Sequence, residues 1–321
     1  MKKVTLKDIA QELNITISTV SHVMNGIDDI SEETKKKVLE TAKKLGYISN
    51  NAAVSLRSGK TFTIAIIIPD ISNPHIAHQI KLIEDKMRLF KYSVIILNTN
   101  EDEEAEYDAI VTACSKQVDG ILLCPTQHST DNIEFLNKID IPYILIGRYF
   151  SQLDTDYVCA DDFKAGALAG KYLVDNSYTN PLYIGAYEYV ESSRNRFDGL
   201  VQAFSEKGIS LSQKRFIQIS PKADSVCSTI RKIIEDNVQF DSIVAFSDLI
   251  AFEIMSMVKN VPVIGFDAIC SHLHIPSYNI SVGMTNGGWA EKATNALLRK
   301  IEGAKDKIHE LINVELFEFN N

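Results

Sequence analysis

The chain has 321 residues, of which 45% are hydrophobic and 23% charged, and its formal net charge is -9. That length allows two or three folding units with separate cores. We expect neither a membrane span nor an export signal, because no run of about 18 apolar residues occurs and the first residues are not apolar enough. Five scattered cysteines without a C-x-x-C pair favour reduced thiols over disulfides or zinc, so we expect a cytoplasmic protein.

The charge is divided unevenly along the chain. Residues 1–60 contain ten Lys and Arg against seven Asp and Glu, whereas the rest of the chain contains 23 against 35. A mildly basic head on an acidic body is typical of a protein whose N-terminal module alone meets nucleic acid. A chance distribution of surface charges is the alternative explanation for this difference between the two parts of the chain.

Residues 5–25, "TLKDIAQELNITISTVSHVMN", predict two short helices joined by a turn. Thr5 and Asp8 form the pattern of a capping box in front of an apolar stripe at helical spacing. Thr16 is the expected N-cap of the second helix. That helix should turn small polar groups outward, and its two faces are predicted as Val20, Val23 and Met24 inward and Ile17, Ser18, Ser21, His22 and Asn25 outward.

A third helix is predicted after Ser31, with an acidic first turn and an apolar stripe formed by Val38, Leu39, Ala42 and Leu45. Two short helices with a tight turn and a third that supports them predict a helix-turn-helix, whose second helix enters the DNA major groove. Short hydrogen-bonding side chains suit that role because they reach base edges. A plain three-helix bundle with a polar second helix is the alternative.

This stretch resembles the DNA-binding head of the lactose-repressor/galactose-repressor family of bacterial transcription regulators. The resemblance implies that Ile17, Ser18 and His22 read the operator. It also implies phosphate and supporting contacts, at Thr5, Lys7, Thr16, Thr19, Ser21, Asn25, Ser31, Thr34 and Tyr47.

The segment "NNAAVSLRSG" that follows resembles the hinge helix of the same family. A helix this short is not stable alone in water, so the resemblance implies that it forms only when paired with its twin on DNA. Asn50 and Ala53 would then contact DNA, and Leu56 would be the apolar wedge that enters a minor-groove step. A flexible linker is the alternative, given the Ser, Asn and Gly content.

From Thr61 onward, short apolar runs such as "TIAIIIPD", "DGILLCP" and "VPVIGFD" alternate with amphipathic stretches. Strand-helix alternation predicts parallel sheets, and about 260 residues are too many for one sheet. We therefore predict an all-α helix-turn-helix head (1–48), a hinge helix or linker (49–60) and an α/β body (61–321). The body should consist of two doubly wound parallel-sheet lobes that resemble the type I periplasmic-binding-protein fold, with crossings near 162, near 290 and at "INVELFEF".

Polar side chains follow several predicted strands, where doubly wound sheets bind ligands. The resemblance gives Arg196 and Asp267 the strongest effector contacts, whereas Asp248 is interpreted as structural. The full set predicted to bind an effector is Asp70, Asn73, His75, Arg148, Arg196, Ser247 and Asp267. Asn, Arg and Asp side chains from two lobes suit a small polyhydroxyl or heterocyclic ligand, and the resemblance favours a sugar or sugar phosphate.

Nucleotide-binding, metalloprotease and serine-hydrolase motifs are missing, so we expect no catalytic residues, no metal and no cofactor. The leading prediction is a dimeric, ligand-responsive repressor of carbohydrate-utilisation genes that binds a pseudo-palindromic DNA operator. A cytoplasmic sugar or purine receptor without gene control is the main alternative. An enzyme of doubly wound architecture is a weaker one.

Overall fold

The computed structural model describes residues 4–24, 27, 29–48, 59–219, 225–273, 280–285 and 287–319, apart from the side chain of His272. The chain divides into two compact units, a head (residues 1–61) and a body (residues 62–321). The predicted hinge residues Asn50, Ala53 and Leu56 lie outside the described residues, as does Asn25. No helix within the described ranges is long and apolar enough to cross a membrane.

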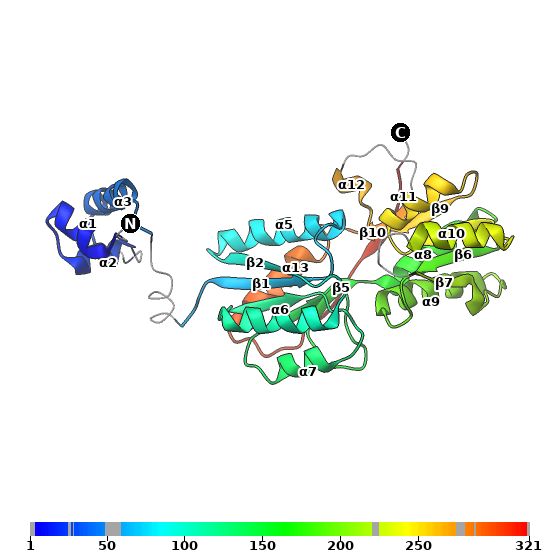
Figure 1. Ribbon diagram of the computed structural model, residues 1–321, viewed down its shortest axis with the longest axis horizontal. Helices are drawn as coiled ribbons and strands as arrows, with labels where there is room; N and C mark the ends of the chain where they lie inside the picture. The colour runs from blue at the N-terminus through cyan, green and yellow to red at the C-terminus, as the bar shows by residue number, and fades with distance from the viewer. Residues whose placement is uncertain are drawn as a thin grey trace. The chain divides into compact units, whose positions relative to one another are not determined.

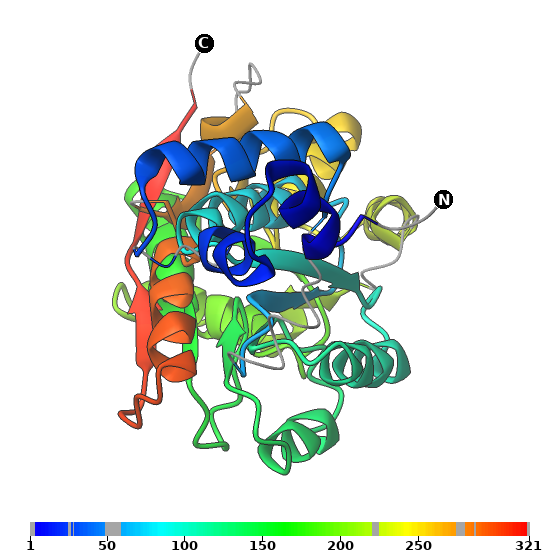
Figure 2. The same cartoon turned by 90° about the vertical axis from the view of Figure 1, so that its left-hand side faces the viewer.

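Among its described residues the head has three helices, α1 (Leu6–Leu13), α2 (Ile17–Met24) and α3 (Glu32–Leu45), drawn in blue in Figure 2. The capping box predicted before α1 is present. The Thr5 hydroxyl accepts from the Asp8 amide at 3.4 Å, and the Asp8 carboxylate accepts from the Thr5 amide at 2.7 Å. Asn14 in the left-handed conformation ends α1, which lets the chain turn within two residues into α2.

The core of the head is small but closed. Ile9, Val20 and Val38, one from each helix, are fully buried, and smaller side chains fill the space between them. The prediction that Leu39 belongs to this core is wrong, because its side chain is 52% exposed. The i, i+4, i+7 stripe of α3 runs through residues 38, 42 and 45, and Leu39 lies about 100° to the side of it.

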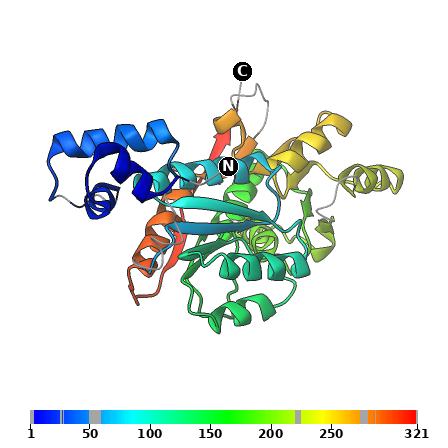
Figure 3. The ribbon, with the colours of Figure 1, turned by 60° about the vertical axis from the view of Figure 1, so that its left-hand side comes forward.

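The N-terminal lobe of the body is built on a six-stranded sheet in the order β11-β5-β4-β3-β1-β2, and all its pairs are parallel. Its strands are β1 (Thr63–Ile68), β2 (Ser93–Asn98), β3 (Gly120–Leu123), β4 (Tyr143–Ile146), β5 (Tyr157–Ala160) and β11 (His309–Ile312). One face is covered by α5 (Pro74–Leu89) and α13 (Ala290–Ile301), and the other by α6 (Glu103–Ser115) and α7 (Asp131–Asn137) (Figure 3). Both faces are buried, which explains the continuous apolar runs in the sequence.

The C-terminal lobe repeats this plan with a second sheet, in the order β12-β10-β9-β8-β6-β7. Its strands are β6 (Pro181–Gly185), β7 (Phe216–Gln218), β8 (Ser242–Ala245), β9 (Val263–Phe266), β10 (Ile280–Met284) and β12 (Val314–Glu318). Helices α8 (Asp162–Asp175) and α9 (Glu191–Ser205) pack on one face, and α10 (Ser225–Glu235) and α11 (Asp248–Met257) on the other (Figure 1). A short helix, α12 (Cys270–Leu273), follows β9, and a 3-10 turn, η1 (Gln213–Arg215), precedes β7.

The predicted pair of doubly wound lobes is therefore confirmed, with two differences of detail. The predicted return strand "INVELFEF" is split into β11 and β12, which belong to different sheets. In addition, β12 is antiparallel to β10. The reason is that β10 runs toward the N-terminal lobe, whereas the chain leaving β11 runs in the opposite direction.

Three segments carry the chain between the lobes, as the sequence predicted: at Asp161, at residues 285–289 and at Asn313. Hydrogen bonds tie them together. The Asp161 amide donates to the Ile312 carbonyl at 3.1 Å, and the Thr285 amide donates to the Asn313 carbonyl at 3.2 Å. Hydrogen bonds thus join the three crossings, at Asp161, Thr285 and Asn313, into one connection between two separately packed cores. We call this connection the waist.

Helices α8 and α9 approach so closely that only glycine fits at their contact. A Cβ atom added to Gly166 would lie 1.8 Å from the Arg196 carbonyl oxygen, and one added to Gly199 would lie 2.0 Å from the Phe163 carbonyl oxygen. Gly166 and Gly170 are the two glycines of the segment "GALAG" in α8, and a Cβ atom added to Gly170 would lie 2.7 Å from the Ala203 Cβ atom.

Replacing Gly199 with Ala should therefore destabilise the body by about 3 kcal/mol or more, because the methyl group overlaps backbone atoms that cannot rotate away. Urea unfolding followed by circular dichroism measures this change. Gln202→Ala, on the exposed face of α9, is the matched control and should unfold like the unmodified chain. Equal midpoints for all three proteins would contradict the packing argument.

Candidate functional site

The outward face of α2 carries small polar groups and one exposed apolar side chain. Thr16, Ile17 and Ser18 are exposed, with Ile17 at 48%, and Ser21 and His22 are half-buried on the same side of the helix. The predicted reading residues Ile17, Ser18 and His22 thus share one surface of the head. An exposed isoleucine at the start of a helix gains nothing from folding, but it can contact an apolar group on a partner, such as a thymine methyl.

Several hydroxyls predicted to contact phosphates also cap helices in the head. Thr16 accepts from the Thr19 amide at 3.1 Å, and Ser31 accepts from the Thr34 amide at 3.4 Å. Each capping hydroxyl also shares a hydrogen bond with the hydroxyl of the same threonine, at 2.8 Å and 2.9 Å. A hydroxyl can donate once and accept twice, so one position on each is left for contact with a ligand. Two further positions predicted to contact phosphates are not helix caps. Lys7 is exposed, whereas Tyr47 packs against the core of the head.

His22 is held by a partner that the sequence analysis did not single out. Its Nδ1 lies 2.9 Å from a carboxylate oxygen of Asp29, which follows α2 in the chain. Because a carboxylate only accepts hydrogen bonds, Nδ1 must carry the hydrogen. This bond fixes the orientation of the imidazole ring, and therefore also the direction in which Nε2 points.

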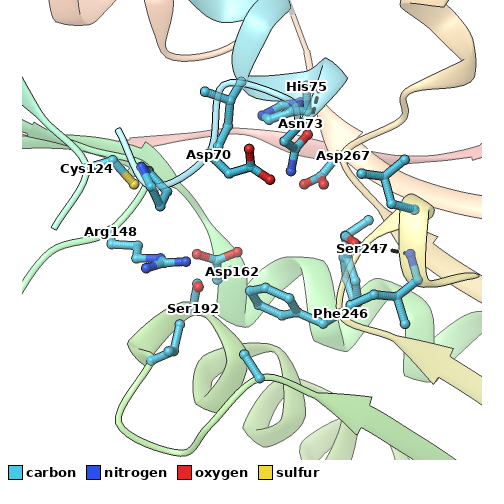
Figure 4. Close-up of a pocket in the computed structure, with 18 of the residues that line it drawn as sticks. Asp70, Asn73, His75, Cys124, Arg148, Asp162, Ser192, Phe246, Ser247 and Asp267 are labelled. Carbon is cyan, nitrogen blue, oxygen red and sulfur yellow. Dashed lines mark hydrogen bonds between the residues drawn. The ribbon is translucent and has the colours of Figure 1, made fainter. Parts of the chain in front are cut away.

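The body contains a cavity of about 880 Å³ between its lobes. Its walls come from the carboxyl ends of the parallel strands in both sheets, as doubly wound folds predict. All the predicted effector residues line it: Asp70, Asn73, His75, Arg148, Arg196, Ser247 and Asp267. Figure 4 labels all of them except Arg196.

Arg196 is the most constrained of these side chains. Its Nε donates to Asp162 at 2.7 Å, and its Nη1 donates to the Phe246 carbonyl at 2.6 Å. The guanidinium also lies 4.5 Å from the ring centre of Phe266 and 3.9 Å from a carboxylate oxygen of Asp267. Burial alone would lower the pKa of Arg196, but Asp162 and Asp267 outweigh burial and the pKa is raised. The side chain is a fixed, permanently charged donor.

The loop that carries Asp267 is built under backbone strain. Asp267 and Ala268 have φ values of 95° and 49°, a left-handed conformation that non-glycine residues rarely adopt. Hydrogen bonds hold it in place: the Ala268 amide donates to the Ser281 hydroxyl at 3.0 Å, and the Ile269 amide donates to Asp248 at 2.8 Å. Asp248 is fully buried, in agreement with its structural interpretation. The loop aims Asp267 into the cavity.

Asp70, Asn73 and Ser247 also serve the local backbone. The Asn73 side chain caps α5 by accepting from the His75 amide at 2.9 Å, and Ser247 caps α11. Asp70 accepts from the Ser72 amide through one oxygen at 2.8 Å. These caps fix the side chains, while the amide of Asn73 and the second oxygen of Asp70 are not engaged by these bonds.

Arg148, on the N-terminal lobe, forms a two-pronged ion pair with Glu101, at 2.8 Å and 2.6 Å. It also donates to the Pro125 carbonyl at 3.2 Å. Burial opposes its charge, but Glu101 raises the pKa of Arg148 above its ordinary value. Next to this pair, the buried Glu106 accepts from the Thr126 amide at 2.7 Å, which anchors the loop after β3.

That loop reaches across the cavity to the C-terminal lobe. The Gln127 side chain accepts from the Glu191 amide at 3.1 Å. Next to it, the rings of His128 and Tyr189 lie 4.4 Å apart, and the Tyr189 hydroxyl is 3.0 Å from His128 Nε2. These two contacts bridge the lobes at the cavity wall.

Asp162, Glu101 and the bridging pair were not singled out as site residues from the sequence. Asp162 had a weak signal, because it directly follows the strand β5 and begins a helix. That strand, "YVCA", is too short and too mixed to stand out. Glu101 and Tyr189 lie in loops and had no signal, since their partners are 47 and 61 residues away in the chain.

Two family models match the chain. The model described as "Bacterial regulatory proteins, lacI family" covers residues 5–50, and the one described as "Periplasmic binding proteins and sugar binding domain of LacI family" covers residues 61–270. The first match favours a regulator over a receptor without gene control, because it falls on the helix-turn-helix itself.

Two curated relatives share 30% identity with the chain: Catabolite control protein A of Priestia megaterium and the HTH-type transcriptional regulator RegA of Clostridium saccharobutylicum. Each alignment covers 82% of this chain and 82% of the relative. In fold, the chain is similar to the lac repressor dimer bound to operator and the anti-inducer ONPF, with a TM-score of 0.86 and 18% identity over 99% of this chain and 98% of that one. The relatives are transcription regulators rather than enzymes. The chain belongs to the lacI family of bacterial regulatory proteins.

Proposed function

We propose that the chain is a repressor that binds a pseudo-palindromic operator as a homodimer in the cytoplasm, and that a small polyhydroxyl effector bound in the body controls it. The observation that carries this proposal is that one chain joins a helix-turn-helix head to a two-lobed body whose cavity is lined by fixed polar side chains. A relative is named for catabolite control, which supports carbohydrate-utilisation genes as targets.

In the head, the outward face of α2 would enter the major groove. Ile17 would contact a thymine methyl, and Ser18 and His22 would reach base edges. Two copies of the head would read two half-sites related by the two-fold axis of the dimer. The excess of basic residues in 1–60 favours DNA, and the acidic remainder disfavours it, so contact is restricted to the N-terminal part.

In the body, the bonded waist allows the lobes to rotate as units around the cavity. An effector that contacts side chains of both lobes binds better when they are close, and so shifts the population toward that arrangement. The expected coupling to operator binding is on the order of 1–3 kcal/mol, or roughly 5- to 150-fold in affinity.

The DNA-reading assignment predicts that His22→Ala lowers affinity for the operator about ten- to a hundredfold, because one base contact is lost. The operator is first selected in vitro from random duplexes with the unmodified chain, and affinities are then compared by gel shift at fixed salt. Gln202→Ala, on the exposed face of α9 in the body, serves as the control and should bind as the unmodified chain does. Undiminished binding by the His22 variant would refute the assignment.

The bond between His22 and Asp29 gives a separate prediction. Asp29→Ala should reduce the ratio of selected-operator to random-duplex affinity about three- to tenfold, because the His22 ring is no longer oriented. Loss of the negative charge strengthens both affinities alike, so it cancels in the ratio. In a His22→Ala background the same change should leave the ratio unaltered. An equal drop in both backgrounds would mean that Asp29 acts independently of His22.

The effector assignment predicts that Arg196→Lys weakens binding of any sugar found by thermal-shift screening at least about tenfold. Lysine keeps the charge but cannot contact Asp162, the Phe246 carbonyl and a ligand from one planar group. The matched control is Arg299→Lys. Arg299 lies on α13 and forms a surface ion pair with Asp306. If calorimetry finds the same dissociation constant for both variants, Arg196 does not contact the effector.

A further inference from the structure

The charges that line the cavity are strongly unbalanced. Among the described lining residues, six carboxylates stand against two guanidinium groups, and none is a lysine. The carboxylates belong to Asp70, Glu101, Asp102, Asp162, Glu253 and Asp267, and the guanidinium groups to Arg148 and Arg196.

Both guanidinium charges are already neutralised inside the protein. Arg148 is paired with Glu101 through two bonds, and these side chains are 10% and 23% exposed. Arg196 is paired with Asp162, and these side chains are 11% and 5% exposed. An anionic ligand that bonded to either arginine would meet a charge that is already neutralised, and it would place its own negative charge beside the carboxylate of the existing pair.

Within the described part of the chain, the remaining carboxylates face the cavity without a comparable cation. Asp70 follows β1 in the N-terminal lobe and Asp267 follows β9 in the C-terminal lobe, and both line the pocket (Figure 4). Only Asp267 approaches a guanidinium, at 3.9 Å from the already paired Arg196. Carboxylates accept hydrogen bonds and cannot donate them, so the two lobes present acceptors to whatever lies between them.

Helix N-termini at the cavity are the feature that would attract an anion. At four of those that the structure describes, the protein's own side chains occupy the helix end. Asp102 caps α6, Asn73 caps α5 and Ser247 caps α11. In addition, α8 has the Asp161 cap and an acidic first residue, Asp162. The α9 N-terminus has no side-chain cap, but its first residue is Glu191, whose amide is bonded to Gln127.

We infer that the effector carries no anionic group: it is a neutral or amino-bearing polyhydroxyl compound rich in hydrogen-bond donors, and phosphate esters are excluded. This inference rests on the proposed function, since it specifies the ligand of the same cavity. Hydroxyl or ammonium donors match Asp70 and Asp267 from both lobes, and the arginines keep unused N–H groups for neutral oxygen acceptors. A phosphate would meet the uncompensated carboxylates at close range in a cavity between the lobes, where like charges repel.

The experiment compares matched ligands on the full chain by thermal shift and calorimetry: neutral sugars and amino sugars, each beside its phosphate ester, with inorganic phosphate as a further probe. Every compound that binds should be non-anionic, and its phosphate ester should bind at least about tenfold more weakly. Tighter binding of a phosphate ester than of its parent, binding of inorganic phosphate in the cavity, or no binding by any member would overturn the inference.

Operator binding is measured in parallel by gel shift, so that the two proposals fail separately. A chain that binds operator but prefers a phosphate ester refutes the ligand class alone. A chain that binds neutral or amino sugars but no duplex DNA supports the ligand class and refutes the repressor.

A charge reversal tests the physical cause. Asp70→Lys places an unpaired cation in the cavity and should raise the affinity for the phosphate ester relative to its parent sugar about tenfold. Asp108→Lys makes the same change of net charge on the exposed face of α6, outside the cavity, and should leave that ratio unaltered. If the ratio is the same in both variants, the cavity charge does not select the ligand.

Discussion

The ion pair between Arg196 and Asp162 is the contact on which the geometry of the cavity depends. Asp162 is the first residue of the C-terminal lobe after the chain leaves β5, and Arg196 lies on the neighbouring helix. The two side chains meet because Gly166 and Gly199 let those helices touch through their backbones. A buried ion pair gains little net stability. Its effect here is positional, since it fixes the guanidinium against Phe266 and beside Asp267.

The same principle applies at the other side of the cavity, where Glu101 fixes Arg148 and the buried Glu106 fixes the loop after β3. Each lobe therefore holds its polar side chains rigidly, while few bonds join the lobes. Among the described residues, these bonds include the waist at Asp161 and Asn313 and the bridges from Gln127 and His128. A structure that is stiff within each lobe and weakly joined between them can convert ligand contact into rotation of one lobe against the other.

Most of this architecture was predictable because its signals are local. Caps, helical stripes and buried strands each occupy fewer than about 15 consecutive residues, and so does the glycine spacing of α8. The predicted effector residues also met in one cavity, because strand ends of parallel sheets converge. The partners of the charged groups were not predictable. Glu101 and Arg148 are 47 residues apart, Asp162 and Arg196 are 34 apart, and no periodicity links them. The exposed Leu39 shows the related limit, that an apolar residue beside a stripe is indistinguishable from one within it.

Ligand selectivity and control of the lobes follow from one electrostatic arrangement. Asp70 and Asp267 come from different lobes, so their mutual repulsion opposes closure of an empty cavity. A ligand that donates hydrogen bonds to both carboxylates removes that opposition and adds contacts that exist only when the lobes are close. An anion of the same size adds repulsion instead, and its binding would separate the lobes. A ligand shifts a conformational equilibrium only by its difference in affinity for the two states. In the proposed effector site, hydrogen-bond donors bind better when the lobes are close, whereas anions bind better when the lobes are apart. Asp70 and Asp267, which select the ligand, therefore also determine the direction of the conformational response.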